Sequence, residues 1–265
     1  MGTEHIPAAF KRRVPWPVVG ERVRDRIIRP PGYSSHVVVL GKSGSGKDHM
    51  VRWGILPWLP LARVVVLVTK MGGSDSTWDG YGTTLSGPGD LPALISRGNP
   101  GGVPRYVVPL QPGRVTSAEV GRLLKQLGDV GEIVIVVGDA ARLSTRVSDG
   151  GLQLERELSN LMSEGRESGI TVIGCATSAA WAATGLKDQA AAVMIGQTGG
   201  GDTLAEFAKI ARLPGDARAR TPERAALATL PERWWLYTDH RDGEIWSRVA
   251  RPPAAGWISE AWSAA

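Results

Sequence analysis

Short apolar runs alternate along the chain with segments of helical periodicity, and this alternation predicts a mixed α/β domain. The apolar runs are rich in Val, Ile and Leu on both sides, which is typical of strands buried in a parallel sheet. Other segments repeat their apolar residues every three to four positions and predict amphipathic helices, the first of them preceded by a capping box, Thr116 to Glu119. The predicted strands cover residues 37–40, 63–69, 106–110, 132–137, 170–176 and 191–195. The predicted helices cover residues 120–127, 154–162 and 204–211. A C-terminal β-hairpin is predicted over residues 234–238 and 244–249.

Proline and arginine set residues 1–33 apart from the rest of the chain. Five prolines interrupt this segment, so that at most a short helix over residues 21–28 is predicted. We interpret the segment as a basic, solvated arm rather than as a DNA-binding one. Residues 34–250 show no internal boundary and form one predicted domain, followed by a tail of residues 251–265. Within the domain, residues 71–104 are rich in Gly, Ser and Pro and predict an irregular insertion.

The composition is that of an ordinary water-soluble protein. The chain has 265 residues, 42% of them hydrophobic, which suffices for one sizeable α/β domain. No stretch approaches the ~20 apolar residues of a membrane span, so we expect a membrane to be reached only through a partner. Cys175 is the single cysteine, which excludes disulfides within the chain and favours a reducing, cytoplasmic setting. The net charge of +5 allows a polyanionic partner such as DNA without requiring one.

The strongest chemical signal directly follows the first predicted strand. Residues 41–47 read Gly-Lys-Ser-Gly-Ser-Gly-Lys, the phosphate-binding P-loop pattern in a strand–loop–helix setting. The glycines let the backbone curl around a polyphosphate, while the following helix and Lys47 add positive charge. Asp48 departs from the pattern, which has Ser or Thr at this position to ligate Mg²⁺. We expect a nucleotide to be bound by Gly41, Lys42, Ser43, Gly44, Ser45, Gly46, Lys47, Asp48 and His49.

A second acidic element is needed by P-loop proteins that hydrolyse ATP. In these proteins an Asp at the end of an apolar strand holds the Mg²⁺ shell, and a following Glu polarises the attacking water. Here the apolar strand of residues 132–137 is followed by Gly138 and Asp139, and then by Ala140-Ala141-Arg142-Leu143. An intervening strand between the P-loop and the acidic strand is typical of the RecA-like branch of these proteins.

Four segments together resemble the FtsK/HerA family of DNA-pumping ATPases. They are the P-loop, the loop of residues 70–75, the acidic strand with residues 140–143, and residues 164–170 leading into Ala176-Thr177-Ser178. The similarity spans about residues 34–200. It implies a RecA-like P-loop NTPase fold with a mainly parallel sheet sandwiched between helices. It also implies ATP and Mg²⁺ as cofactors, double-stranded DNA as a partner, and assembly into a homo-oligomeric ring, as in a hexamer.

Aligned on this family, the acidic site is altered at several positions. The family's Mg²⁺-side Asp falls on Gly138, its catalytic Glu on Asp139 and its sensor Gln on Ser178. Positions 48 and 138 flank the same metal in this fold, so we hypothesise that Asp48 supplies the Mg²⁺ ligand that Gly138 cannot. Asp48 and Asp139 are the predicted metal ligands, and Asp139 also orients the attacking water. The competing interpretation is a site that binds nucleotide but has lost hydrolysis.

Three arginines are candidates for roles that depend on a neighbour. In ring-forming relatives an arginine of the adjacent subunit often stabilises the γ-phosphate, and the resemblance assigns this role to Arg166. The alternative for Arg166 is a surface residue that complements a helix dipole. Arg142 and Arg146, just past the acidic strand, either contact DNA phosphates inside a ring or lie in a solvated loop. The predicted catalytic residues are therefore Lys47, Asp139, Arg166 and Ser178.

The sequence leads to three functional interpretations. The first is an ATP-driven translocase on double-stranded DNA that serves DNA transfer, segregation or viral genome packaging. Such a protein is cytoplasmic or, as a packaging ATPase, virion-associated, with a membrane or capsid protein as a further partner. The second is a hydrolysis-deficient ring subunit that works with an active paralogue. The third, a small nucleotide kinase, would usually carry an arginine-rich lid and an acceptor-binding segment, and the sequence shows neither clearly.

Overall fold

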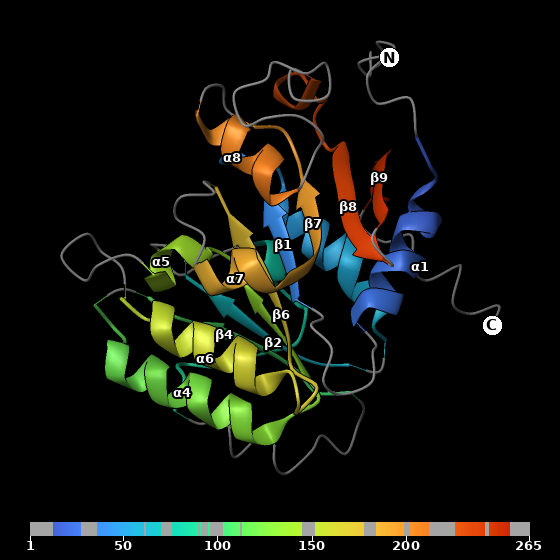
Figure 1. Cartoon of the computed structure of the whole chain (residues 1–265). Coiled ribbons are helices and arrows are strands. Elements are labelled where there is room, and N and C mark those ends of the chain that lie inside the picture. Colours follow the sequence, from blue (N-terminus) through green and yellow to red (C-terminus); the bar gives the residue numbers. More distant parts are fainter. Residues whose placement is uncertain are drawn as a thin grey trace.

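One twisted β-sheet forms the frame of the molecule (Figure 1). The computed structural model describes residues 13–27, 36–60, 62–69, 76–89, 91, 95, 103–111, 113–144, 152–177, 184–198, 202–211, 226–241 and 244–254. Within these residues, nine strands hydrogen-bond in the order β3-β4-β2-β5-β6-β1-β7-β8-β9. The strands are β1 (His36–Leu40), β2 (Arg63–Val68), β3 (Thr83–Thr84), β4 (Arg105–Pro109), β5 (Ile133–Val137), β6 (Thr171–Ala176), β7 (Ala190–Ile195), β8 (Trp235–Arg241) and β9 (Glu244–Ala250).

The sheet is parallel from β3 to β7 and antiparallel over its last two strands. β1 lies between β6 and β7, so that Val38 is paired with Gly174 on one side and with Val193 on the other. β6 in turn separates β1 from β5, which is the order expected for the RecA-like branch. β8 and β9 form the predicted C-terminal hairpin, paired from Trp235 with Ala250 to Arg241 with Glu244. All six strands predicted as parallel are therefore confirmed to within a residue or two at their ends.

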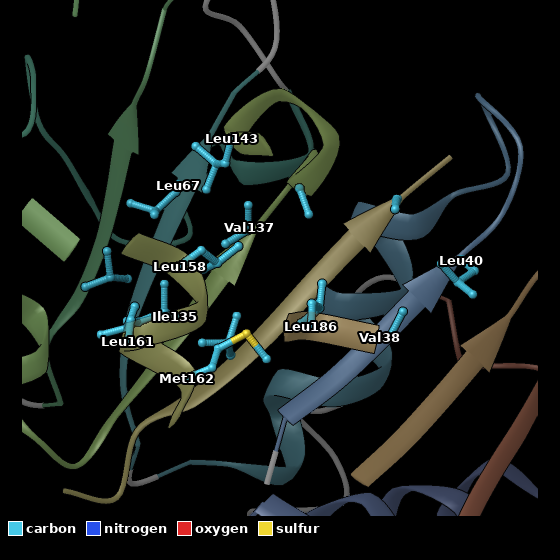
Figure 2. Close-up of a cluster of buried hydrophobic side chains, with 14 of the residues drawn as sticks. Val38, Leu40, Leu67, Ile135, Val137, Leu143, Leu158, Leu161, Met162 and Leu186 are labelled. Carbon is cyan, nitrogen blue, oxygen red and sulfur yellow. The ribbon is translucent and has the colours of Figure 1, made fainter. Parts of the chain in front are cut away.

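Helices cover both faces of the sheet, and each face has its own apolar core. One cluster joins alternate strand residues, such as Val38 and Leu40, to helices on one face (Figure 2). The intervening residues, such as Val37 and Val39, point to the other face and pack on Val19 and its neighbours. Because successive side chains of a strand point to opposite faces, both must be apolar when both faces are covered. This explains why β1, β2 and β5 are apolar after their first residues.

The first face carries most of the helices. The predicted helix after the capping box is α4 (Ser117–Val130), in which Thr116 accepts from the Glu119 amide as expected. The second predicted helix is α6 (Glu155–Gly165), and the third is α8 (Asp202–Ile210). The pattern did not predict α5 (Ala140–Ser144) or α7 (Thr184–Gln189), which are too short to show a clear repeat. Of the helices that the structure describes, none is long and apolar enough to cross a membrane.

The other face carries two helical segments that support the P-loop. The segment after the P-loop is continuous from Lys47 to Trp58, passing from α2 (Lys47–His49) through a π-helical stretch (Met50–Ile55) to a 3₁₀ turn (Leu56–Trp58). The second is α1 (Trp16–Ile27), whose Trp16 Nε1 donates a hydrogen bond of 3.0 Å to Gly54 O. The helix predicted over residues 21–28 thus begins five residues earlier, because prolines are tolerated in a first turn.

A buried ionic network fastens α1 to the C-terminal hairpin. Arg22 binds Asp239 through two hydrogen bonds of 2.8 and 2.9 Å, and Arg26 Nε donates a third at 3.0 Å. Tyr237 Oη donates a fourth at 2.7 Å. Burial alone would raise the pKa of Asp239, but the hydrogen bonds from Arg22, Arg26 and Tyr237 outweigh burial and hold this pKa below its usual value. Arg22 and Arg26 therefore fasten a packed helix, which the interpretation of a solvated arm missed.

A buried histidine stands at the start of β1, at the edge of the sheet opposite the P-loop. His36 Nδ1 accepts a 3.0 Å hydrogen bond from the Val172 amide, so Nε2, 3.1 Å from Met162 O, carries the proton. Burial, with a smaller contribution from the charge of Arg166, lowers the pKa of His36 to about 4. The folded protein thus requires the neutral ring.

We expect the protein to lose stability on mild acidification because His36 must become charged. The unfolded chain takes up this proton near pH 6.5 and the folded protein only near pH 4, so stability is complete above pH 6.5 and falls between these values. Lowering the pH from about 7.5 to about 5.5 should reduce the free energy of unfolding by about 1 kcal/mol, measured by urea denaturation. The NMR signal of the His36 ring tests the cause, because a midpoint near pH 6.5 in the folded protein contradicts this explanation.

Candidate functional site

The P-loop forms at the carboxyl end of β1, as its sequence predicts. Gly44 and Gly46 have φ angles of +76° and +84°, which side chains rarely adopt, and they turn the loop back on itself. The neighbouring strands hold its first residues, since Gly41 N donates to Ala176 O and Lys42 N to Gln197 O. Lys42, Ser43, Gly44 and Gly46 are exposed at the rim, whereas Ser45 is buried beneath them. The loop therefore presents its backbone to solvent at the edge where parallel sheets place ligands.

Lys47 reaches back across the loop that precedes it. Its Nζ donates to Gly41 O at 2.9 Å and to Lys42 O at 3.0 Å, and the residue is 9% exposed. The ammonium group is thus fixed at the mouth of the loop. A polyphosphate bound by the loop amides would meet this charge directly.

Asp48 faces the end of the acidic strand. Its buried carboxylate lies beside Gly138, because a Cβ built on Gly138 would stand 3.3 Å from Asp48 Oδ1. Gly138 is itself fixed by a 3.1 Å hydrogen bond from its amide to Leu67 O. The carboxylate of Asp48, which comes from the P-loop side, therefore occupies the space into which a side chain at position 138 would point.

Asp139 follows at the same edge, half-exposed and held from two sides. Thr69 Oγ1 donates to the Asp139 carbonyl oxygen at 3.2 Å, and Arg142 Nε lies 3.6 Å from Asp139 Oδ2. Arg142 is thus placed in α5 with its guanidinium next to the carboxylate, rather than in an extended loop. The two predicted metal ligands come together with Lys47 at one edge of the sheet.

The donor set fits Mg²⁺ bound together with a nucleotide. Within the described residues no group of three or more His, Cys, Asp or Glu side chains could hold a metal by itself. Mg²⁺ in nucleotide sites is usually held by one or two carboxylates, with phosphate oxygens and waters as the remaining ligands. Asp48 and Asp139 would provide those carboxylates, and the P-loop would hold the phosphates.

The other predicted catalytic residues lie apart from this cluster. Arg166 is an exposed residue at the C-terminal end of α6, beyond the amino end of β6. Because β6 runs parallel to β1, Arg166 stands at the edge of the sheet opposite the P-loop. Ser178, Arg146 and the loop of residues 70–75 lie outside the described residues.

Sequence reasoning missed a cavity of about 220 Å³ on the other side of the P-loop. Gly44, Gly46 and His49 line one wall, and the other is lined by Glu232, Arg233, Trp235 and residues 251–254. Burial, followed by the charges of Arg233 and Arg52, lowers the pKa of His49, so its ring is neutral at pH 7. No local pattern marks the second wall, which is nearly 200 residues away in the chain.

Comparisons with known proteins found likenesses only among solved structures. No protein-family model matches the sequence, and no curated protein matches it. Among solved structures, the chain is similar to B204, the DNA-packaging ATPase of Sulfolobus turreted icosahedral virus, with a TM-score of 0.58 at 15% identity over 84% of this chain and 99% of that one. The genome-packaging NTPase B204 of Sulfolobus turreted icosahedral virus 2 in complex with AMPPCP gives a TM-score of 0.56 at 13% identity over 83% and 98%. VirB4 of Thermoanaerobacter pseudethanolicus gives 0.58 at 10% identity over 86% and 91%.

These likenesses define the fold. The chain has the RecA-like P-loop NTPase fold, with a mostly parallel sheet flanked by helices, as the sequence predicts. One of these structural neighbours is a DNA-packaging ATPase, which agrees, at the level of the fold, with the resemblance recognised in the motifs. At identities of 10 to 15% the likeness concerns the fold, and the activity has to be argued from the site.

Proposed function

We propose that this protein is an ATP-driven translocase on double-stranded DNA, working in a ring as a DNA-transfer or genome-packaging motor. The observation that carries the proposal is the grouping of Lys47, Asp48 and Asp139 at the carboxyl edge of the sheet, in a fold shared with packaging ATPases. Such a grouping suits phosphoryl transfer to water, in which positioning and charge neutralisation provide most of the catalysis.

Each residue then has a separate task. The P-loop amides and Lys47 bind the phosphates, and Asp48 and Asp139 hold the metal. Bound Mg²⁺ would neutralise charge that develops on the phosphates during cleavage. Asp139 would also orient the attacking water, since its carboxylate is partly exposed at the edge of the sheet where the P-loop lies. Arg166 is too far from its own P-loop, so in this proposal it serves the site of the next subunit in a hexameric ring.

The test is Mg²⁺-dependent ATP hydrolysis by the purified protein with and without long double-stranded DNA. We expect turnover that increases with DNA and is lost in Lys47→Ala, because this variant lacks the cation at the mouth of the loop. The proposal also places the protein in the cytoplasm or in a virion, with a capsid or membrane protein as a further partner. ATP hydrolysis that DNA does not increase would contradict a translocase, although it would still show an ATPase.

The altered acidic site supports a second candidate, a nucleotide-binding ring subunit without hydrolysis. Gly138 offers no carboxylate at the position where the family has its Mg²⁺-side Asp, and Asp139 is one methylene shorter than the family's Glu. A displacement of about 1 Å in such a site can cost roughly a hundredfold in rate. Tight Mg²⁺-ATP binding with no turnover, with or without DNA, is the result expected of this candidate.

A further inference from the structure

A cavity of about 360 Å³ lies at the edge of the sheet opposite the P-loop. Its lining includes Arg52, Trp53, Leu56, Pro57, Tyr81 and Arg105, and we call it the arginine pocket. Arg105 is the first residue of β4, which runs parallel to β2 and so to β1, whereas the P-loop follows the last residue of β1. The pocket lies on the face that carries α1, since Tyr81 packs against the apolar cluster of that face.

Arginine and aromatic side chains alternate in the lining of the pocket. The Cζ atom of Arg52 lies 4.6 Å from the ring centre of Trp53 and 5.7 Å from that of Tyr81. The Cζ atom of Arg105 lies 5.3 Å from the ring centre of Tyr81. Stacking on a ring fixes the orientation of a guanidinium group and leaves its in-plane N–H donors available for a ligand. Gly82 permits this arrangement, because a side chain there would overlap the backbone of Arg105.

The two arginines differ in what their donors bind. Arg52 donates hydrogen bonds to the carbonyl oxygens of Thr77 and Asp79, which fixes the segment that precedes β3. Arg105 makes no hydrogen bond or ion pair of its side chain within the described part of the chain. None of the described residues that line the pocket is acidic. Arg105 is therefore an oriented cation that can bind an anion from outside the chain through charge-assisted hydrogen bonds.

Two buried donors next to the pocket support an anionic ligand. Tyr81 Oη and Trp78 Nε1 have no acceptor among the described residues, and their rings meet edge to face at 5.4 Å. Burial, partly offset by the charges of Arg105 and Arg52, raises the pKa of Tyr81 to about 12, so its hydroxyl keeps the proton at pH 7. Native proteins seldom leave buried donors unpaired, and an oxygen that enters the pocket beside Tyr81 would supply an acceptor.

The apolar part of the lining favours a carboxylate on a peptide over a phosphate of DNA. Surfaces that bind DNA are more polar and far more positively charged than surfaces that bind proteins. Trp, Tyr and Arg are instead the residues enriched where protein partners bind most tightly. We propose that the arginine pocket is a docking site for an acidic peptide segment of a partner protein, with its carboxylate on Arg105 and apolar neighbours on Trp53 and Pro57. The pocket shares no residue with the P-loop site, so this inference stands apart from the proposed function.

The experiment selects binders from a library of random peptides displayed on phage, with the full chain as bait. We expect the enriched peptides to carry Asp or Glu next to apolar residues. One enriched peptide is then titrated by calorimetry into the unchanged chain, into Arg105→Gln and into Arg63→Gln as the matched control. Arg63 is the exposed first residue of β2, the neighbour of β4, and does not line the pocket. Arg105→Gln should weaken binding at least about tenfold, and Arg63→Gln should change it less than about twofold.

Two further titrations separate recognition of the carboxylate from damage to the fold. Arg105→Lys keeps the charge but loses the planar fork, so its affinity should lie between those of the unchanged chain and Arg105→Gln. The same peptide with its acidic residue replaced by the corresponding amide should bind the unchanged chain about tenfold more weakly. This second loss involves no change in the protein.

Enriched peptides without acidic residues, or equal affinities of Arg105→Gln and the unchanged chain, would overturn the proposal. A DNA site is a distinct outcome that also overturns it. In that case Arg105→Gln leaves peptide binding unchanged and lowers the salt dependence of duplex DNA binding by about one phosphate contact. Lys47→Ala should bind the peptide like the unchanged chain, because Lys47 lies at the opposite edge of the sheet. Failure of nucleotide binding is thereby distinguished from failure of this inference.

Discussion

Replacing Asp48 by Thr should lower Mg²⁺-dependent turnover roughly a hundredfold, since a carboxylate would be lost from the metal site. The family pattern has Thr or Ser at position 48, so this variant restores the common P-loop sequence. Its turnover should nevertheless fall. Gly138→Asp alone should also be harmful. Its new Cβ would stand 3.3 Å from Asp48 Oδ1, and two carboxylates in that space repel each other.

The double variant Asp48→Thr/Gly138→Asp tests whether the two positions exchange one metal ligand. It moves the carboxylate back to the end of β5 and frees the space beside it, and it should recover turnover to within about tenfold of the unchanged protein. The dependence of ATP affinity on Mg²⁺ gives a second measure for the case of slow turnover. Asp129→Thr, the same substitution at an exposed site on α4, is the control. A double variant no better than either single one disproves the exchange.

Asp239→Asn should destabilise the fold by about 3–5 kcal/mol, because it leaves the buried Arg26 and the half-buried Arg22 without their counter-charge. Asn keeps the shape of the side chain, so a large loss reports on charge rather than on packing. The readout is the midpoint of urea denaturation.

Asp25→Asn is the matched control for this effect. It removes the carboxylate of the Arg24–Asp25 pair, whose side chains are 39% and 57% exposed, and should cost at most about 1 kcal/mol. Equal losses in the two variants would show that the network at Asp239 has no special weight. Trp16 of α1 donates a hydrogen bond to Gly54 in the helical segment that follows the P-loop. Asp239→Asn, which weakens the attachment of α1, should therefore also weaken nucleotide binding.

The sequence by itself determined those parts of the protein that short-range physics controls. Valine-rich runs predicted the parallel strands because a strand covered on both faces must be apolar on both. The Thr116–Glu119 capping box predicted the start of α4, since both of its hydrogen bonds join residues three apart. The spacing of glycines and Lys47 predicted the P-loop because the loop is built from seven consecutive residues.

Only the tertiary structure decided which distant residues meet. Arg22 and Arg26 resemble part of a solvated arm in the sequence, because their partner Asp239 is more than 200 residues away. Arg233 and residues 251–254 reach the P-loop only through the antiparallel turn of the last two strands, which no local pattern specifies. In the sequence, Asp48 is only a departure from the P-loop pattern. The structure shows that Gly138, at the end of β5, lies beside it. In each case the role of a charged residue or of a cavity depends on contacts that form only when the whole sheet is assembled.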